Sequence, residues 1–172
     1  ICLIKTSTSS GENFLGGYRS GLEKNPDVEQ FTVIYQISDM PVLFGEQEIA
    51  ANAFSVDSTF FKIFPYRVIA GSGRIVRPRD VVITRSFWKK KLGGKNAIGA
   101  TFKNTKGNKF TIIGVVDDPD TKTSWMPDIF MSDELDEFLF FDPIYAMLMA
   151  SDADIALLNK KYSKEHPRSK WS

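Results

Sequence analysis

Apolar residues recur at every second position over several short stretches of the chain, which predicts strands more often than helices. Residues 28–37 show this alternation from Phe31 onward, so we expect a strand with one buried face. Residues 81–83 form an unbroken apolar run, typical of a strand buried on both faces. Residues 100–104 and 109–116 flank a glycine-bearing turn and predict a hairpin. Further strands are expected at 1–5, 42–55 (two strands around Gly45), 66–70, 125–131 and 144–150.

Helical spacing is found near both ends of the chain. Residues 12–24 place apolar side chains on one helical face, although Gly16, Gly17 and Gly21 each lower intrinsic helix stability by ~1 kcal/mol relative to alanine. Tertiary packing must therefore hold this helix. We also expect a helical turn at 133–141, a final helix that begins at Ser151 and Asp152 and ends at Pro167, and a polar tail over the last five residues.

A short aromatic helix is predicted in the middle of the chain. Residues 58–64 carry phenylalanines at helical spacing, and Asp57 or Ser58 can accept the first free N–H groups. Pro65 ends this helix, because proline cannot continue the hydrogen-bond pattern. The chain thus starts strand–helix–strand and ends strand–helix, around a middle region, 42–131, of mixed strands with two short helices. This layout predicts an α+β fold.

The second short helix follows the apolar strand at 81–83. Thr84 stands at its N-cap, and the lysines at 89–91 suit the negative end of the helix dipole. Gly93 provides the left-handed stop. Because Gly93-Gly94-Lys95 follows a helix, it lacks the helix N-terminus that phosphate-binding loops use, and we interpret it as a helix end.

Charge and size exclude some classes of protein. The 172 residues are 42% hydrophobic and 25% charged, which is ordinary for a folded domain. Lysine and arginine total 22 against 21 acidic residues, for a net charge of +1, so no overall field attracts nucleic acid. The basic stretch 67–79 lacks the aromatic alternation of a base-stacking surface. We therefore expect no nucleic-acid partner.

The single cysteine, Cys2, excludes an intramolecular disulfide, and we interpret it as a small apolar residue of the first strand. An alternative is a lipid-anchor cysteine, but no apolar signal segment precedes it. No stretch approaches the ~20 apolar residues that span a bilayer. The sequence has no initiator methionine and no signal peptide, so we expect a fragment of a longer protein or a processed product.

No pattern predicts catalysis, a cofactor or a metal. The acidic residues at 117–120 include a proline and lack the glycine and closing glutamate of a calcium loop, so they indicate a solvated turn. Those at 133–137 suit the start of a helical turn. The only histidine, His166, and Cys2 stand at opposite ends of the chain, which argues against a nucleophile–base pair. We expect no enzyme activity.

The middle of the chain carries four motifs that together resemble one family. Residues 60–65 followed by Gly71 resemble "dyFkvFpf…G", residues 81–93 resemble "vvIsesfAkklFG", residues 97–99 resemble "PiG", and residues 110–119 resemble "ftVvGVvkDpP". These are motifs of the MacB-like periplasmic core domains of ABC transporter permeases of the MacB/FtsX-like class, here of the Bacteroidetes type. The motif residues with structural roles are Phe60, Phe61, Phe64, Gly71, Ile83, Gly93, Gly99, Gly114, Asp118 and Pro119. The departures lie at packing or surface positions: Leu92, Ala97 and Ala100.

The resemblance implies a periplasmic, non-catalytic domain of a bacterial inner-membrane permease. Its fold would be a porter-like lobe of β-α-β units (residues 1–41 and 132–172) with an inserted mixed α/β lobe (42–131). Its role would be to couple ATP-driven motion of the membrane helices to export, extraction or signalling in the envelope. The implied partners are an ABC ATPase subunit, reached through transmembrane helices outside this chain, a second permease copy and an envelope protein.

Two other classes of function stay open at this point. A freestanding extracytoplasmic ligand-binding or sensor module would need a concave pocket with convergent polar groups. A soluble enzyme would need titratable groups gathered in one place, and dispersal of Asp117, Asp118 and Asp133 would exclude it. The sequence names neither the substrate nor the direction of transport, the partner subunits or the oligomeric state.

Overall fold

The computed structural model is a mixed, mostly β structure, in agreement with the predicted α+β class. It describes residues 2–6, 21–119, 126–133, 143–150, 156, 160 and 169–171. The strands are β1 (Cys2–Thr6), β2 (Val28–Phe44), β3 (Gln47–Val56), β4 (Val68–Gly71), β5 (Asp80–Thr84), β6 (Thr101–Asn104), β7 (Lys109–Val116), β8 (Ile129–Ser132), β9 (Pro143–Met149) and β10 (Ser169–Trp171). The helices are α2 (Phe60–Ile63) and α3 (Arg85–Lys91).

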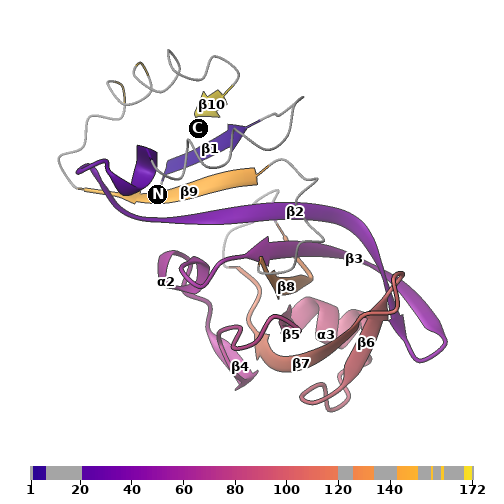
Figure 1. The fold of residues 1–172 in the computed structure, drawn as a ribbon. Helices are drawn as coiled ribbons and strands as arrows, with labels where there is room; N and C mark the ends of the chain where they lie inside the picture. Colours follow the sequence, from indigo (N-terminus) through magenta and orange to yellow (C-terminus); the bar gives the residue numbers. More distant parts are fainter. Residues whose placement is uncertain are drawn as a thin grey trace.

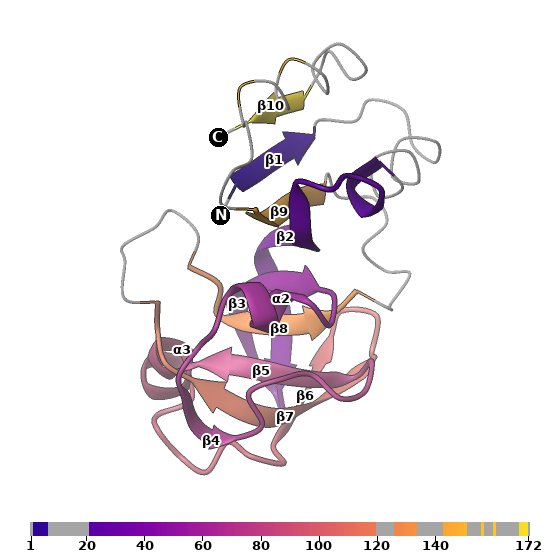
Figure 2. The same cartoon turned by 90° about the vertical axis from the view of Figure 1, so that its left-hand side faces the viewer.

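Six of the described strands close into a ring, which we call the barrel. The C-terminal part of β2 pairs with β3, β3 with β8, β8 with β5, β5 with β7, β7 with β6, and β6 again with β2. The β3–β8 and β5–β7 pairs are parallel and the other four are antiparallel. β4 pairs with β7 over residues 114–116, beyond the end of β6. Figures 1 and 2 show this compact body below the long strand β2.

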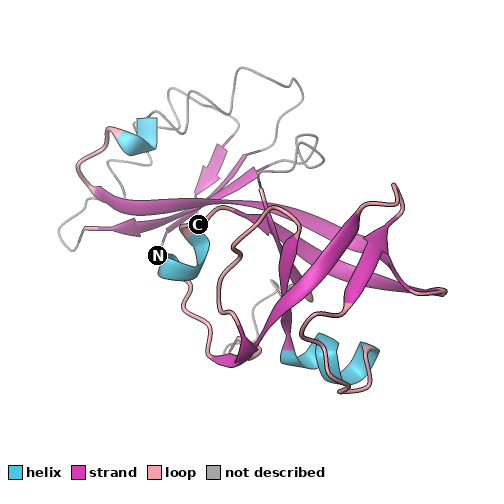
Figure 3. Ribbon diagram, turned by 60° about the horizontal axis from the view of Figure 1, so that its bottom comes forward, coloured by secondary structure: helices cyan, strands magenta, loops and turns pink. Residues whose placement is uncertain are grey.

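The N-terminal part of β2 belongs to a second layer, which we call the terminal sheet. Its strand order is β10-β1-β9-β2, with every neighbouring pair antiparallel. Because β2 pairs with β9 over 28–35 and with β3 over 34–44, one strand runs through both sheets. Figure 3 shows it passing from the terminal sheet into the barrel without a break. The predicted polar tail was wrong for residues 169–171, which form the edge strand β10.

The barrel is filled by alternate residues of its strands. Ile129 and Met131 of β8 point inward, as do Val81 and Ile83 of β5, and all four side chains are at most 1% exposed. Phe102 and Phe110 stack face to face across the β6–β7 hairpin at 5.3 Å between ring centroids. Interdigitated apolar side chains of this kind are the main source of stability in a small domain.

The intervening residues of the same strands form a second core on the outside of the barrel. Val82 of β5 and Phe130 of β8 are fully buried there, under Phe60 of α2. Ile144 and Ala146 of β9 join the same cluster. The unbroken apolar run at 81–83 is therefore explained by burial on both faces, as predicted. This outer core also joins the terminal sheet to the barrel.

The structure corrects one predicted strand end. β2 was expected to stop at residue 37, yet it continues to Phe44, with an irregularity between Ile37 and Met40. Asp39 lies at this irregularity with φ of 51°, and its N–H donates to Asn52 Oδ1 at 3.3 Å. A bulge lets a strand bend without ending. The turn around Gly45, with φ of 63°, then leads into β3 as expected.

The local elements around α3 follow the sequence pattern. The Thr84 hydroxyl accepts the Phe87 N–H at the N-cap, and Gly93 and Gly94 both have positive φ after the last turn. Thr59 occupies the N-cap position of α2 without a side-chain bond, and the Asp57 carboxylate accepts the first free N–H groups, those of Thr59 and Phe60, as predicted. The predictions for helices at 12–24, 133–141 and after Ser151 lie wholly or mostly outside the described residues.

Candidate functional site

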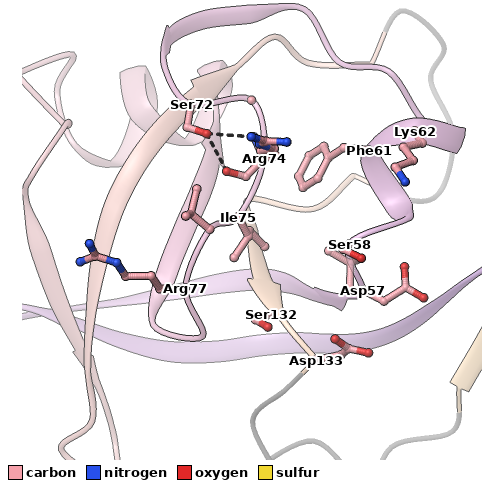
Figure 4. Close-up of a pocket in the computed structure, with 13 residues that line it drawn as sticks. Asp57, Ser58, Phe61, Lys62, Ser72, Arg74, Ile75, Arg77, Ser132 and Asp133 are labelled. Carbon is pink, nitrogen blue, oxygen red and sulfur yellow. Dashed lines mark hydrogen bonds between the residues drawn. The ribbon is translucent and has the colours of Figure 1, made fainter.

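A groove of about 980 Å³ lies on the described surface beside α2. Three segments form it: α2 with the preceding residues, the loop 72–77 between β4 and β5, and the ends of β3 and β8. Figure 4 shows these segments around an open space, with Phe61 and Ile75 facing it. The lining residues are Val56, Asp57, Ser58, Phe61, Lys62, Ser72, Gly73, Arg74, Ile75, Val76, Arg77, Ser132 and Asp133.

The α2 wall of the groove is fixed by aromatic packing. Phe60 lies 5.4 Å from Phe130 between ring centroids, and Phe61 lies 5.3 Å from the same ring. Tyr66 packs on Phe130 as well, at 5.1 Å. A helix of four residues has little stability of its own, so these contacts hold it in place. Burial raises the pKa of the Tyr66 hydroxyl to about 12.

Asp57 ties this wall to the long strand β2. One carboxylate oxygen, Oδ1, accepts the Thr32 hydroxyl at 2.7 Å and the backbone N–H groups of Thr59 and Phe60 at 2.9 and 3.2 Å. The other, Oδ2, accepts the Val33 N–H at 3.1 Å. The pairing of β3 with β2 ends at Val56. Beyond this point the Asp57 carboxylate, in place of the β3 backbone, accepts the N–H of Val33 in β2. We call this arrangement the Asp57 clamp.

The opposite wall depends on two glycines that pair across β4 and β7. Gly71 has φ of 67°, and a Cβ on it would run into the Ile113 carbonyl. A Cβ on Gly114 would collide with the Ser72 carbonyl. The backbones of β4 and β7 can therefore come this close only because neither residue has a side chain. The Ser72 N–H then donates to the Ile113 carbonyl at 2.8 Å, which starts the loop that forms the wall.

The loop itself is closed by a serine turn. The Ser72 hydroxyl donates to the Arg74 carbonyl at 2.7 Å and accepts the Arg74 N–H at 3.2 Å. At its other end, Asp80 Oδ2 accepts the Arg77 N–H at 3.0 Å. These bonds fix the loop backbone, so the positions of its side chains along the groove are set by the fold.

A smaller hollow of about 340 Å³ lies between α2 and the terminal sheet. Leu22 and Phe31 contribute its apolar lining, and it shares Asp57 and Lys62 with the larger groove. α2 and the Asp57 clamp thus separate two neighbouring hollows, one against each sheet.

The acidic turn after β7 has a structural role. Asp118 accepts the Ser86 N–H at 3.1 Å and the Ser86 hydroxyl at 2.9 Å, which supplements the Thr84 cap of α3. Asp117 binds Arg85 at 2.9 Å and Arg67 at 3.4 Å. Its side chain is 26% exposed, so the prediction of a solvated turn missed these bonds. The sequence contained part of this information. Asp117 and Asp118 follow β7, α3 follows β5, and β5 and β7 are neighbouring parallel strands.

The carboxylates are dispersed. Asp117 and Asp118 bind around the start of α3, whereas Asp133 lines the groove beside α2. Within the described ranges, no three histidine, cysteine or acidic side chains are close enough to hold a metal ion. The enzyme alternative required Asp117, Asp118 and Asp133 to lie together, and the structure places Asp133 apart from the other two. None of the described helices has the length and hydropathy needed to cross a membrane.

Comparison with known proteins assigns the family. The model of the MacB-like periplasmic core domain matches residues 7–161. The chain belongs to this family. No protein with a curated description matches it. The resemblance inferred from the motifs is therefore confirmed, and the matched range extends beyond the motif region, residues 60–119, in both directions.

Solved structures share the fold of this MacB-like domain at low sequence identity. The periplasmic region of MacB from Actinobacillus actinomycetemcomitans has a TM-score of 0.73 at 16% identity, over 99% of this chain and 87% of that one. A domain of a putative permease protein from Porphyromonas gingivalis has a TM-score of 0.75 at 17% identity, over 99% and 88%. The extracellular domain of the noncanonic ABC-type transporter YknZ from Gram-positive bacteria has 0.73 at 14%, over 100% and 98%.

The motif residues of the MacB-like domain do not gather at one point. Phe60, Phe61 and Phe64 pack around α2 on the outer core, and Gly71 and Gly114 form the crossing beside the groove. Ile83 lies inside the barrel. Gly93 and Gly99 have positive φ in open space, and Asp118 and Pro119 follow β7. The groove residues Lys62, Arg74 and Ile75 were missed, because no sequence pattern brings α2 and the loop 72–77 together.

Proposed function

We propose that this MacB-like domain is the non-catalytic extracytoplasmic part of an ABC transporter permease subunit in a bacterial inner membrane. The observation that carries the proposal is the family match over residues 7–161. The domain passes motion of the membrane helices, driven by an ATPase partner on the other side of the membrane, to substrate or envelope components.

The arrangement of the strands supports this proposal. β1 and β10 pair with each other, so the described segments nearest the two chain ends lie together at one edge of the terminal sheet. Membrane helices joined to these two segments would enter the domain at one place. The long strand β2 and the outer core then connect this edge to the barrel without a flexible link.

We further propose that the chain divides as the sequence suggested, into a porter-like lobe (1–41 and 132–172) and an inserted lobe (42–131). The first boundary falls inside β2 and another at the end of β8. Two lobes divided at these positions share strands. A shared strand suits a domain that transmits force better than a domain whose lobes open and close.

The test uses the complete reading frame. We expect apolar helices directly before residue 1 and after residue 172, and an ATPase encoded as a neighbour or in the same chain. The full-length protein, purified from membranes with this ATPase, should form a complex whose ATP hydrolysis requires the permease. A reading frame that lacks an apolar segment at either of these two positions would contradict the proposal.

A freestanding ligand-binding module is the second candidate, and the groove of about 980 Å³ is the observation that favours it. Ligand pockets commonly measure about 300–1,000 Å³. A soluble reading frame together with ligand-dependent thermal stabilisation would decide for this candidate.

A further inference from the structure

The larger groove carries two exposed cations next to an apolar strip. Lys62 and Arg74 are exposed and line it, and Figure 4 shows them on opposite sides of the Phe61 ring. Among the described residues, neither cation has an ion-pair partner. Ile75 lies below Phe61, and Val76 on the same loop is 66% exposed.

Two carboxylates, Asp57 and Asp133, also line the groove, and among the described residues neither forms an ion pair with Lys62 or Arg74. All four hydrogen bonds of the Asp57 clamp go to Thr32, Val33, Thr59 and Phe60, so its oxygens are committed to the fold. Arg77 also lines the groove, but its side chain points away from the Phe61 ring (Figure 4). An anionic ligand group would therefore meet Lys62 and Arg74 first.

The shape of the groove indicates the kind of ligand. Its volume is at the upper end of the range for small-molecule sites. Its lining combines apolar side chains with hydroxyl and charged groups, whereas a site for a lipid chain would be mainly apolar. An extended peptide suits such a lining, because its side chains alternate and its backbone carries donors and acceptors.

We propose that this groove binds a short extended segment of a partner protein that carries an acidic residue next to an apolar one. The acidic side chain binds Lys62 and Arg74, and the apolar side chain packs on Phe61 and Ile75. The proposal goes beyond the permease function and does not depend on it, because the binding is a property of this domain alone.

The experiment titrates the 172-residue protein with the peptide Ac-Leu-Glu-Leu-Glu-NH₂ and follows backbone amide resonances. We expect shifts at Phe61, Ile75 and Ser132, and affinity that weakens with added salt, since exposed charge pairs are screened. The glutamine counterpart, Ac-Leu-Gln-Leu-Gln-NH₂, should bind about tenfold more weakly, because it loses both ion pairs.

Paired variants locate the site. Lys62→Ala combined with Arg74→Ala should weaken the glutamate peptide about tenfold and leave the glutamine peptide unchanged. The matched control, Lys89→Ala with Lys90→Ala, removes the same charge from the exposed end of α3 and should change neither affinity. Val76→Asp alters an exposed side chain and should weaken the glutamate peptide without affecting the fold.

Three results would overturn the proposal. The first is equal affinity for the two peptides. The second is the absence of amide shifts around the groove at millimolar peptide. The third is binding to phosphatidylglycerol vesicles, lost in the Lys62/Arg74 variant, without binding to either peptide, which would assign the charge to a lipid surface.

Discussion

At the scale of single residues, the positions of Gly114 and Gly45 require glycine for two different reasons. Gly114 has an ordinary strand conformation, and only the Ser72 carbonyl excludes a side chain there. Gly45 is the opposite case, with positive φ and no atom within 4 Å of the place that a Cβ would take. The pair therefore separates steric exclusion from backbone strain, two reasons for glycine that a sequence cannot distinguish.

We predict that Gly114→Ala lowers the free energy of unfolding by about 3 kcal/mol or more, since backbone must move to accept the methyl group. Gly45→Ala should cost only about 1 kcal/mol, the penalty of a left-handed alanine partly offset by a less flexible unfolded chain. Urea unfolding of the two variants measures both. Equal losses would show that β4 moves aside easily, and that the groove wall is not fixed by this crossing.

At the scale of elements, α2 is held by groups far from it in sequence. The Asp57 clamp joins the start of α2 to β2, and the Phe60 and Phe61 rings join it to Phe130. These hydrogen bonds and ring contacts connect β2 and β8 directly to the groove wall.

Asp57→Asn tests the clamp. The asparagine oxygen can still accept the N–H groups of Thr59 and Phe60. Its NH₂ group then faces the Val33 N–H, and because both groups are donors no hydrogen bond can form between them. We expect the unfolding free energy to fall by about 1–3 kcal/mol and the Val33 amide to exchange much faster. Asp80→Asn is the matched control, because Asp80 accepts one exposed backbone N–H, and it should cost less than about 1 kcal/mol. Slow exchange at Val33 in the Asp57 variant would contradict the clamp.

The aromatic cluster around α2 predicts a pH effect through Tyr66. Its pKa is raised from 10.0 to about 12 by burial. Below pH 10.0 the hydroxyl is neutral in both folded and unfolded protein, so its contribution to stability is fully present. Between these two values the unfolded chain loses the proton and the folded chain keeps it, so stability falls as the pH rises. Phenolate absorbance should show this late titration in the native protein and not in Tyr66→Phe, and unfolding of the variant should depend less on pH in this range.

At the scale of the whole molecule, the terminal sheet and the barrel share a strand and a core. β2 pairs in both sheets, and the outer core contains Ile144 and Ala146 of β9 with Phe130 of β8. Separate unfolding of either part would expose this cluster to water. We therefore expect the two sheets to unfold as one cooperative unit.

We predict that amides on both sides exchange through the same global unfolding. The N–H groups of Ala146 in β9 and Ile83 in β5 should show equal exchange free energies, and both should respond equally to urea. A lower value for Ala146 alone would show that the terminal sheet opens independently, and would argue against direct transmission of motion to the barrel.

Much of the central region was predictable because its signals are local. The strand at 81–83, the Thr84 cap and the Gly93 stop lie within thirteen consecutive residues, and the structure confirms each of them. The β6–β7 hairpin follows in the same way from its glycine turn. The end of β2 was mispredicted because its apolar alternation stops at Ile37. The strand nevertheless continues through a bulge at Asp39.

The sequence by itself determined the α+β class, the central strand–helix–hairpin order and the family, because each depends on neighbours along the chain. Only the tertiary structure decided the closing of the barrel, the edge strand β10, the Asp57 clamp and the groove. Each of these joins residues far apart in sequence: Val33 meets Asp57, and the loop 72–77 meets α2 and the end of β8. Such contacts form only when the apolar faces of several strands are buried together, and no local pattern specifies which of those faces will meet.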